Sequence, residues 1–83
     1  MSPATVRELV LYVRAGCHLC DQFLLELSLD LGPAVERLQV LDVDGDVDLA
    51  VRFGLRVPVL EYRGAVLCEA VYVGARVRRA LGV

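Results

Sequence analysis

The sequence predicts a single α/β domain over residues 1–83, with a four-stranded mixed sheet and helices on both of its faces. Short β-rich apolar runs alternate with stretches whose apolar residues recur at helical spacing, in the order β-α-β-α-β-β-α. Hydrophobic residues make up 57% of the chain and charged residues only 24%. So many apolar positions in so short a chain fit a sheet that is covered on both sides, and the length leaves no room for a second core.

The first predicted strand is the continuous apolar run at residues 9–13, which is typical of a strand buried on both faces. A helix is expected after it, because apolar residues separated by polar ones keep helical spacing at Leu19, Phe23, Leu27 and Leu31. Gly32 and Pro33 should end this helix, since glycine can adopt a positive φ and proline cannot continue the helix.

Residues 38–43 read as the second strand, and Asp44 or Asp46 can cap a short helix that runs to about Phe53. A strand, a helix and a further strand in this order predict that the first two strands are parallel. Residues 57–62 and 65–68 read as two more strands, which a two-residue link joins as an antiparallel hairpin. Apolar residues at four-residue steps, Val73, Val77 and Leu81, predict a last helix that Gly82 ends.

Composition and charge exclude several functions. The net charge is −2 and all nine basic residues are arginine, with no basic stripe of the kind that nucleic-acid binding needs. The short cluster at Arg76, Arg78 and Arg79 is better explained by its place near a helix end. No apolar run approaches the roughly 18 residues of a membrane span, and the first residues lack the pattern of a secretory signal. We therefore expect a cytoplasmic monomer that binds neither nucleic acid nor membrane.

The central motif is Cys17-His18-Leu19-Cys20, placed between the first strand and the first helix. Two intervening residues in a turn that enters a helix bring the sulfurs close enough for a reversible disulfide. The free N–H groups and positive dipole of the helix start favour the thiolate of Cys17, which makes it the attacking sulfur. Cys20, about one turn later, is better placed to resolve a mixed disulfide.

A zinc site is an alternative use of these cysteines, but it would need four ligands. Such a set would be strained, because His18 lies between two of the cysteines in the sequence. Two inert cysteines are the third alternative.

Other residues around this motif have two readings each. His18 can tune the sulfurs or shuttle a proton, or it is simply a solvated residue at a helix start. Arg14, three residues before Cys17, can favour the thiolate, or is a solvated residue at a strand end. Pro58, at the head of a strand, marks an edge-strand start or a cis peptide, and base rates alone favour trans. Cys68 is most simply a buried hydrophobe, and a second redox cysteine is the less favoured reading.

The run at residues 9–13 that leads into Cys17-His18-Leu19-Cys20, with Arg56-Val57-Pro58-Val59-Leu60 downstream, resembles the glutaredoxin-like family of small bacterial thioredoxin-fold proteins. The resemblance covers nearly the whole chain. It implies the thioredoxin fold with sheet order 2-1-3-4, a cis peptide at Val57 and Pro58 beside the cysteines, and a site-tuning role for the basic residue at position 14.

The chain departs from glutaredoxins proper at two places. Glutaredoxins carry proline and tyrosine between the cysteines, where this sequence has His18 and Leu19, so these two residues should alter the redox potential. Glutaredoxins also carry a Gly-Gly and a nearby aspartate after strand four to hold glutathione, where this chain reads Cys68-Glu69-Ala70-Val71-Tyr72.

Together these features predict a thiol-disulfide oxidoreductase that reduces or exchanges disulfides with a Cys17/Cys20 couple. Val57 and Pro58 are the expected substrate-binding residues, where an extended substrate can form strand-like hydrogen bonds. No metal or tightly bound cofactor is expected; glutathione is a candidate reductant, and a disulfide-containing protein or a small thiol is the expected partner. The alternatives are a non-catalytic thioredoxin-fold binding module whose cysteines bind metal or pack, and an interaction subunit with an apolar face.

Overall fold

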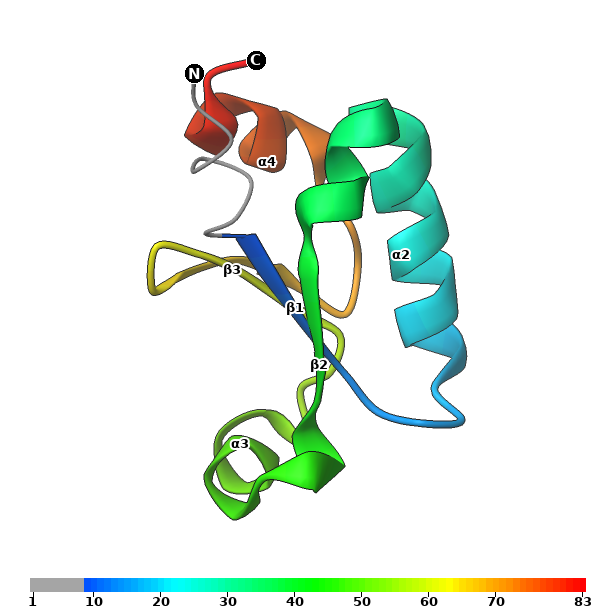
Figure 1. Ribbon diagram of the computed structural model, residues 1–83, viewed down its shortest axis with the longest axis vertical. Coiled ribbons are helices and arrows are strands. Elements are labelled where there is room, and N and C mark those ends of the chain that lie inside the picture. The colour runs from blue at the N-terminus through cyan, green and yellow to red at the C-terminus, as the bar shows by residue number, and fades with distance from the viewer. Residues whose placement is uncertain (1–8) are drawn as a thin grey trace.

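The structure is a computed structural model, and it describes residues 9–83 (Figure 1). Its strands are β1 (Leu9–Val13), β2 (Gln39–Asp42), β3 (Val59–Tyr62) and β4 (Ala65–Glu69). Its α-helices are α2 (His18–Leu31), α3 (Val47–Phe53) and α4 (Gly74–Leu81), and two 3₁₀ helices span Gly32–Arg37 and Val43–Gly45.

The four strands form one mixed sheet in the order β2-β1-β3-β4. β1 pairs in parallel with β2 and antiparallel with β3, and β3 pairs antiparallel with β4. The order, the parallel first pair and the terminal hairpin are those that the sequence and its family resemblance predicted. β1 is therefore a central strand, and the turn and the helix start that follow it carry Cys17 and Cys20.

The two faces of the sheet are covered by different helices, as predicted. Leu9 and Leu11 of β1 pack with Phe23 and Leu27 of α2 and with Val77 of α4 in one buried cluster. Tyr12, one residue out of phase, faces the other side, because side chains alternate along a strand. There it packs with Val43, Val59 and Phe53 of α3, and its ring stacks on that of Phe53 at 4.3 Å between centroids.

Several boundaries differ from the predicted ones. β3 begins at Val59 and not at residue 57, and Pro58, which has no N–H to donate, precedes the strand. β2 is shorter than residues 38–43, because Val43 already belongs to a 3₁₀ turn that the Asp42 side chain caps. β4 extends one residue further, to Glu69.

The end of α2 also differs from the expectation. Gly32 caps the helix with φ 62°, as predicted, but the chain continues as a 3₁₀ helix over Gly32–Arg37 that was not predicted. Proline is accepted there because the first turn of a helix leaves its N–H groups without partners in any case. None of the helices in residues 9–83 is both long and apolar enough to cross a membrane.

Candidate functional site

Cys17 is the N-cap of α2, and its side chain accepts a hydrogen bond from the backbone N–H of Cys20 at 3.1 Å. The turn before it passes through Gly16 with φ 73°, a left-handed conformation that glycine adopts without strain. A sulfur at the N-cap lies against the unpaired N–H groups of the first helical turn and the positive end of the helix dipole. This environment stabilises a negative charge on Cys17 Sγ.

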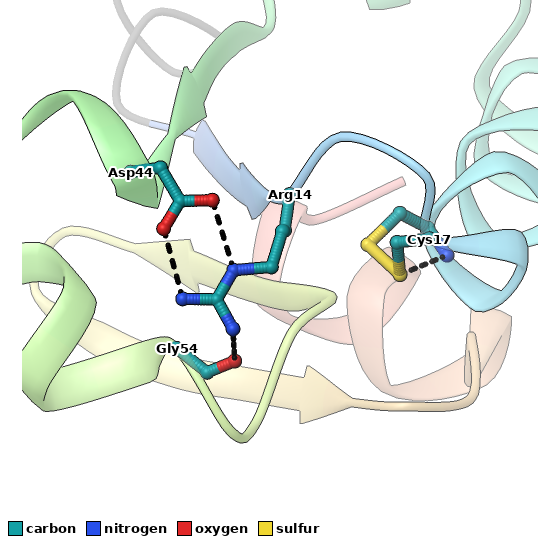
Figure 2. The surroundings of a disulfide bond; sticks show 5 residues. Arg14, Cys17, Asp44 and Gly54 are labelled. Atoms are coloured by element: carbon teal, nitrogen blue, oxygen red, sulfur yellow. Dashed lines mark hydrogen bonds and ion pairs between the residues drawn. A yellow bond between two sulfur atoms is a disulfide. The ribbon is translucent and has the colours of Figure 1, made fainter.

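Cys17 and Cys20 form a disulfide, with their Cα atoms 5.2 Å apart (Figure 2). Access to the two sulfurs is unequal: Cys17 is half-buried, whereas Cys20 is only 3% exposed. His18 and Leu19, between them, are both exposed. A molecule approaching from solvent therefore meets Cys17 before Cys20.

The segment that precedes β3 contains the cis peptide that the family resemblance predicted, between Val57 and Pro58. Pro58 is fully buried, and its carbonyl oxygen accepts a hydrogen bond from the N–H of Ala70 at 2.8 Å. Val57 lies outside the register of the sheet, in which the pairing of β3 with β1 begins at Val59. Pro58 is thus attached to the segment that follows β4.

Glu69 ends β4 and Ala70 follows it, in the stretch where the chain lacks the diglycine of glutaredoxins. Ala70 holds φ at 68°, a left-handed conformation that is unusual for a residue with a side chain. Glu69 accepts two hydrogen bonds from the guanidinium of Arg56, at 3.0 and 2.6 Å. Sequence reasoning missed both features.

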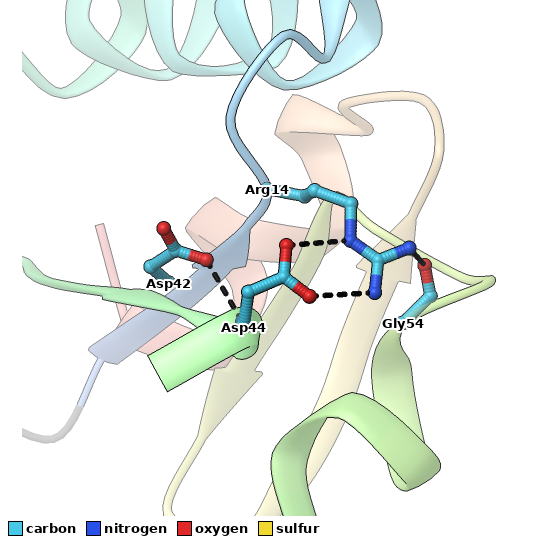
Figure 3. A network of polar contacts seen from close by, with 4 residues as sticks. All are labelled: Arg14, Asp42, Asp44 and Gly54. Atoms are coloured by element: carbon cyan, nitrogen blue, oxygen red, sulfur yellow. Dashed lines mark hydrogen bonds and ion pairs between the residues drawn. The ribbon is translucent and has the colours of Figure 1, made fainter. Parts of the chain in front are cut away.

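The guanidinium of Arg14 lies on Asp44 and Gly54 and points away from the sulfurs (Figure 2). It donates two hydrogen bonds to the Asp44 carboxylate, at 3.0 and 2.9 Å, and a third to the Gly54 carbonyl oxygen at 2.9 Å (Figure 3). Hydrogen bonding to Asp44 raises the pKa of Arg14, so the arginine stays charged. The expected tuning of Cys17 by Arg14 remains a prediction. The observed contacts give Arg14 a second, structural role, because they join the turn after β1 to Asp44 and Gly54.

Asp44 and Gly54 were not predicted to act together with Arg14. Asp42 caps the 3₁₀ turn by accepting from the Asp44 N–H at 2.8 Å, which orients the backbone of Asp44 (Figure 3). A Cβ added to Gly54 would collide with the Ala50 carbonyl oxygen and lie 2.9 Å from the Arg14 guanidinium. The sequence gives no local signal for this contact, because the partners are 30 and 40 residues from Arg14.

Cys68 lies in β4 as a free thiol that is 4% exposed, within the core cluster of Phe23 and Leu27. Burial raises the pKa of its thiol and so keeps it protonated. Within residues 9–83, His, Cys, Asp and Glu side chains nowhere gather in threes as a set of metal ligands.

The fold is thioredoxin-like, with a thiol pair at disulfide distance. Three features define it: a sheet of order 2-1-3-4, a C-x-x-C pair at the start of the helix that follows the central strand, and a cis proline before β3. The family described as "Glutaredoxin-like domain (DUF836)" matches residues 8–82. The chain belongs to this glutaredoxin-like family.

A similar solved structure is the X-ray structure of the Northeast Structural Genomics target protein XcR50 from X. campestris. The two sequences are 35% identical, the match covers 89% of this chain and 95% of the other, and the TM-score is 0.70. A search of curated proteins finds no match to the chain.

Proposed function

We propose that this protein is a thiol-disulfide oxidoreductase in which Cys17 attacks a disulfide and Cys20 resolves the product. The observation that carries the proposal is the unequal placement of two bonded sulfurs. Cys17 is half-buried at the helix N-cap, and Cys20 is 3% exposed one turn later. A nucleophile needs access and a stabilised thiolate, whereas a resolving thiol needs only to lie next to the first sulfur.

The reaction begins from the reduced protein. The Cys17 thiolate attacks one sulfur of the substrate disulfide, whose S–S bond breaks, and the departing thiolate takes a proton from water. Cys20, deprotonated as it reacts, then attacks Cys17 Sγ and releases the second substrate thiol. The substrate gains two electrons and two protons, and the protein is left with the Cys17–Cys20 disulfide. Two molecules of a low-molecular-weight thiol, with glutathione as one candidate, return the protein to the dithiol and leave as their own disulfide.

The residues around the sulfurs have supporting roles in this proposal. The backbone of Val57, which is free of the sheet register, can hold an extended substrate beside Cys17. His18 and Leu19 are exposed between the cysteines, where they can set the redox potential, and the imidazole can donate a proton to the departing thiolate.

Trapping of the mixed disulfide tests the assigned roles. We expect Cys20→Ser to accumulate an adduct with a small neutral disulfide such as bis(2-hydroxyethyl) disulfide, because the internal resolving thiol is missing. Cys17→Ser should form none, since Cys20 is buried. Intact-mass measurements over time distinguish the two variants, and Cys68→Ala, measured alongside, should turn over like the parent protein.

The same serine variants also distinguish the proposed oxidoreductase from a non-catalytic binding module. In the Cys20→Ser variant, alkylation of Cys17 against pH should follow an apparent pKa below the roughly 8.5 of a free cysteine. Equal trapping by both serine variants, or a Cys17 that reacts no faster than a free thiol, would contradict the proposal. Stoichiometric zinc binding by the reduced protein without any disulfide reduction would favour the metal-binding alternative.

A further inference from the structure

A small groove opens beside the disulfide, between the first turns of α2 and the segment that follows β4. Its lining comprises Leu19, Gln22, Phe23 and Glu26 from the helix, with Ala70 and Val71 opposite. The four helical members are spaced so that they share one face of α2. Phe23, only 1% exposed, forms the buried base, and Leu19 and Val71 stand exposed at the rim, at 52% and 64%.

Both walls of the groove adjoin the redox site. Leu19 lies between the two cysteines in the C-x-x-C motif. On the other wall, the N–H of Ala70 donates to the carbonyl oxygen of Pro58, so this wall is attached to the cis peptide segment. Leu19 is two residues from Cys17, and an extended peptide spans about 3.5 Å per residue. A substrate cysteine joined to Cys17 therefore places a neighbouring side chain within reach of the groove.

The charges around the groove are acidic. Glu26, at one end, makes no hydrogen bond or ion pair with any side chain that the structure describes, so its carboxylate is available to a ligand. Two arginines beside the redox site are already paired, Arg14 with Asp44 and Arg56 with Glu69. On the far side of Glu26, Arg78 is held by Asp30. Glutathione, which carries two carboxylates and one ammonium group, finds little here to balance its net negative charge.

We infer that this groove selects the substrate of the proposed oxidoreductase, and that it prefers a peptide or protein disulfide with an apolar side chain and a lysine or arginine next to the cysteine. The apolar side chain lies on Phe23 between Leu19 and Val71, and the basic group faces Glu26. The inference rests on the proposed function, and the reaction itself is the two-electron exchange described above.

A set of four capped peptides tests the inference. Each carries one cysteine as a mixed disulfide with thionitrobenzoate, and the two residues before the cysteine are Leu-Lys, Leu-Glu, Ser-Lys or Ser-Glu; a second set carries the same pairs after the cysteine. Pre-reduced protein attacks the peptide sulfur and releases coloured thionitrobenzoate, the better leaving group. In at least one set, we expect the Leu-Lys peptide to react about tenfold faster than the Ser-Glu peptide.

Variants assign the preference to the groove. Glu26→Gln should remove the difference between Lys and Glu, which we expect to be about threefold, and leave the preference for Leu over Ser. Val71→Ser should weaken the preference for Leu and keep that for Lys. The matched control is Asp48→Asn, which removes an acid on α3 that is paired with Arg52, and it should change neither preference.

The two proposals fail in different ways. If all peptides in both sets react at the same rate, or if oxidised glutathione is reduced as fast as the Leu-Lys peptide, the groove does not select substrates while the oxidoreductase activity stands. If the reduced protein releases thionitrobenzoate from no peptide, the proposed function itself is wrong.

Discussion

Arg14 connects two segments that surround the redox site. It stands just after β1, in the turn that leads to Cys17, and its guanidinium is bonded to the Asp44 carboxylate and to the carbonyl oxygen of Gly54. Gly54 begins the segment that leads to Val57 and Pro58. The arginine therefore braces the proposed substrate-binding segment against the turn that leads to Cys17, and its charge is already balanced by Asp44.

We predict that Arg14→Met and Asp44→Asn act in the same direction, because both weaken the contact between Arg14 and Asp44, and that Arg14→Met, which also removes the hydrogen bond to Gly54, has the larger effect. The KM for a disulfide substrate should rise up to about fivefold, in keeping with the modest energy of a partly exposed ion pair, while kcat stays close to that of the parent protein. The rate of Cys17 alkylation against pH should not move in either variant. A profile shifted in Arg14→Met alone would show that the arginine acts on the thiolate directly.

Ala70 carries a backbone strain that a glycine would relieve. Its φ of 68° costs an L-residue about 1–2 kcal/mol, whereas the extra freedom that glycine gives the unfolded chain costs about 0.4–1 kcal/mol. Ala70→Gly should therefore stabilise the fold by about 0.5–1 kcal/mol and raise Tm by a few degrees, measured by thermal unfolding. Ala75→Gly, in the first turn of α4, is the matched control and should lower Tm. A lower Tm for both variants would contradict the argument.

At the scale of elements, α4 is attached to α2 through Asp30. The Tyr72 hydroxyl donates to Asp30 Oδ2 at 2.6 Å, and Arg78 of α4 lies 2.6 Å from both carboxylate oxygens. The hydrogen bond from Tyr72 lowers the pKa of Asp30, with Arg78 adding to the effect, and burial together with the same hydrogen bond raises the pKa of Tyr72. The contact joins the last turn of α2 to the C-terminal helix.

The lowered pKa of Asp30 gives the stability a pH dependence. Because the folded protein binds this proton more weakly than the unfolded chain does, the contribution is complete above the unfolded pKa of about 3.9 and is lost as pH falls through the lower folded pKa. Asp30→Asn should therefore lower Tm at neutral pH, and the difference from the parent protein should shrink below about pH 4. Glu26→Gln, an unpaired acid on the same helix, should show no such trend.

The element order and sheet pairing could be predicted because they follow from local signals: apolar periodicity, the Gly32 cap and a two-residue hairpin link. The cis peptide at Pro58 could be predicted only from the family resemblance, since base rates alone favoured trans. The contacts of Arg14 with Asp44 and of Asp30 with Tyr72 could not be predicted. They join residues 30 and 42 positions apart, and only the assembled fold brings these side chains together.

At the scale of the whole molecule, the three cysteines are divided between the start of α2, which holds Cys17 and Cys20, and β4, which holds Cys68. Cys17 and Cys20 share a turn, whereas Cys68 packs under α2 with Phe23 and Leu27. Thiol chemistry at Cys68 requires the thiolate, and burial disfavours that form by raising the pKa of the thiol. The fold itself therefore separates the redox pair from the third thiol.

We predict that the oxidised native protein takes up no alkylating reagent at neutral pH and takes up one equivalent when it is unfolded in denaturant. After reduction, Cys17 should react first in the native state, and Cys68 should react only on unfolding. Peptide mapping by mass spectrometry locates each label. A disulfide from Cys68 to either of the other cysteines, or labelling of Cys68 in the folded protein, would contradict this division.

The central position of β1 has a consequence for local opening of the chain. Val10–Tyr12 of β1 pair with β2 on one side and with β3 on the other, so this strand lacks a free edge within the described sheet. Amide hydrogens in such a strand exchange with solvent mainly through global unfolding, whereas helix ends and loops open by small fluctuations. We therefore expect the amide hydrogens of β1, the strand that leads to the two cysteines, to exchange more slowly than those of α4.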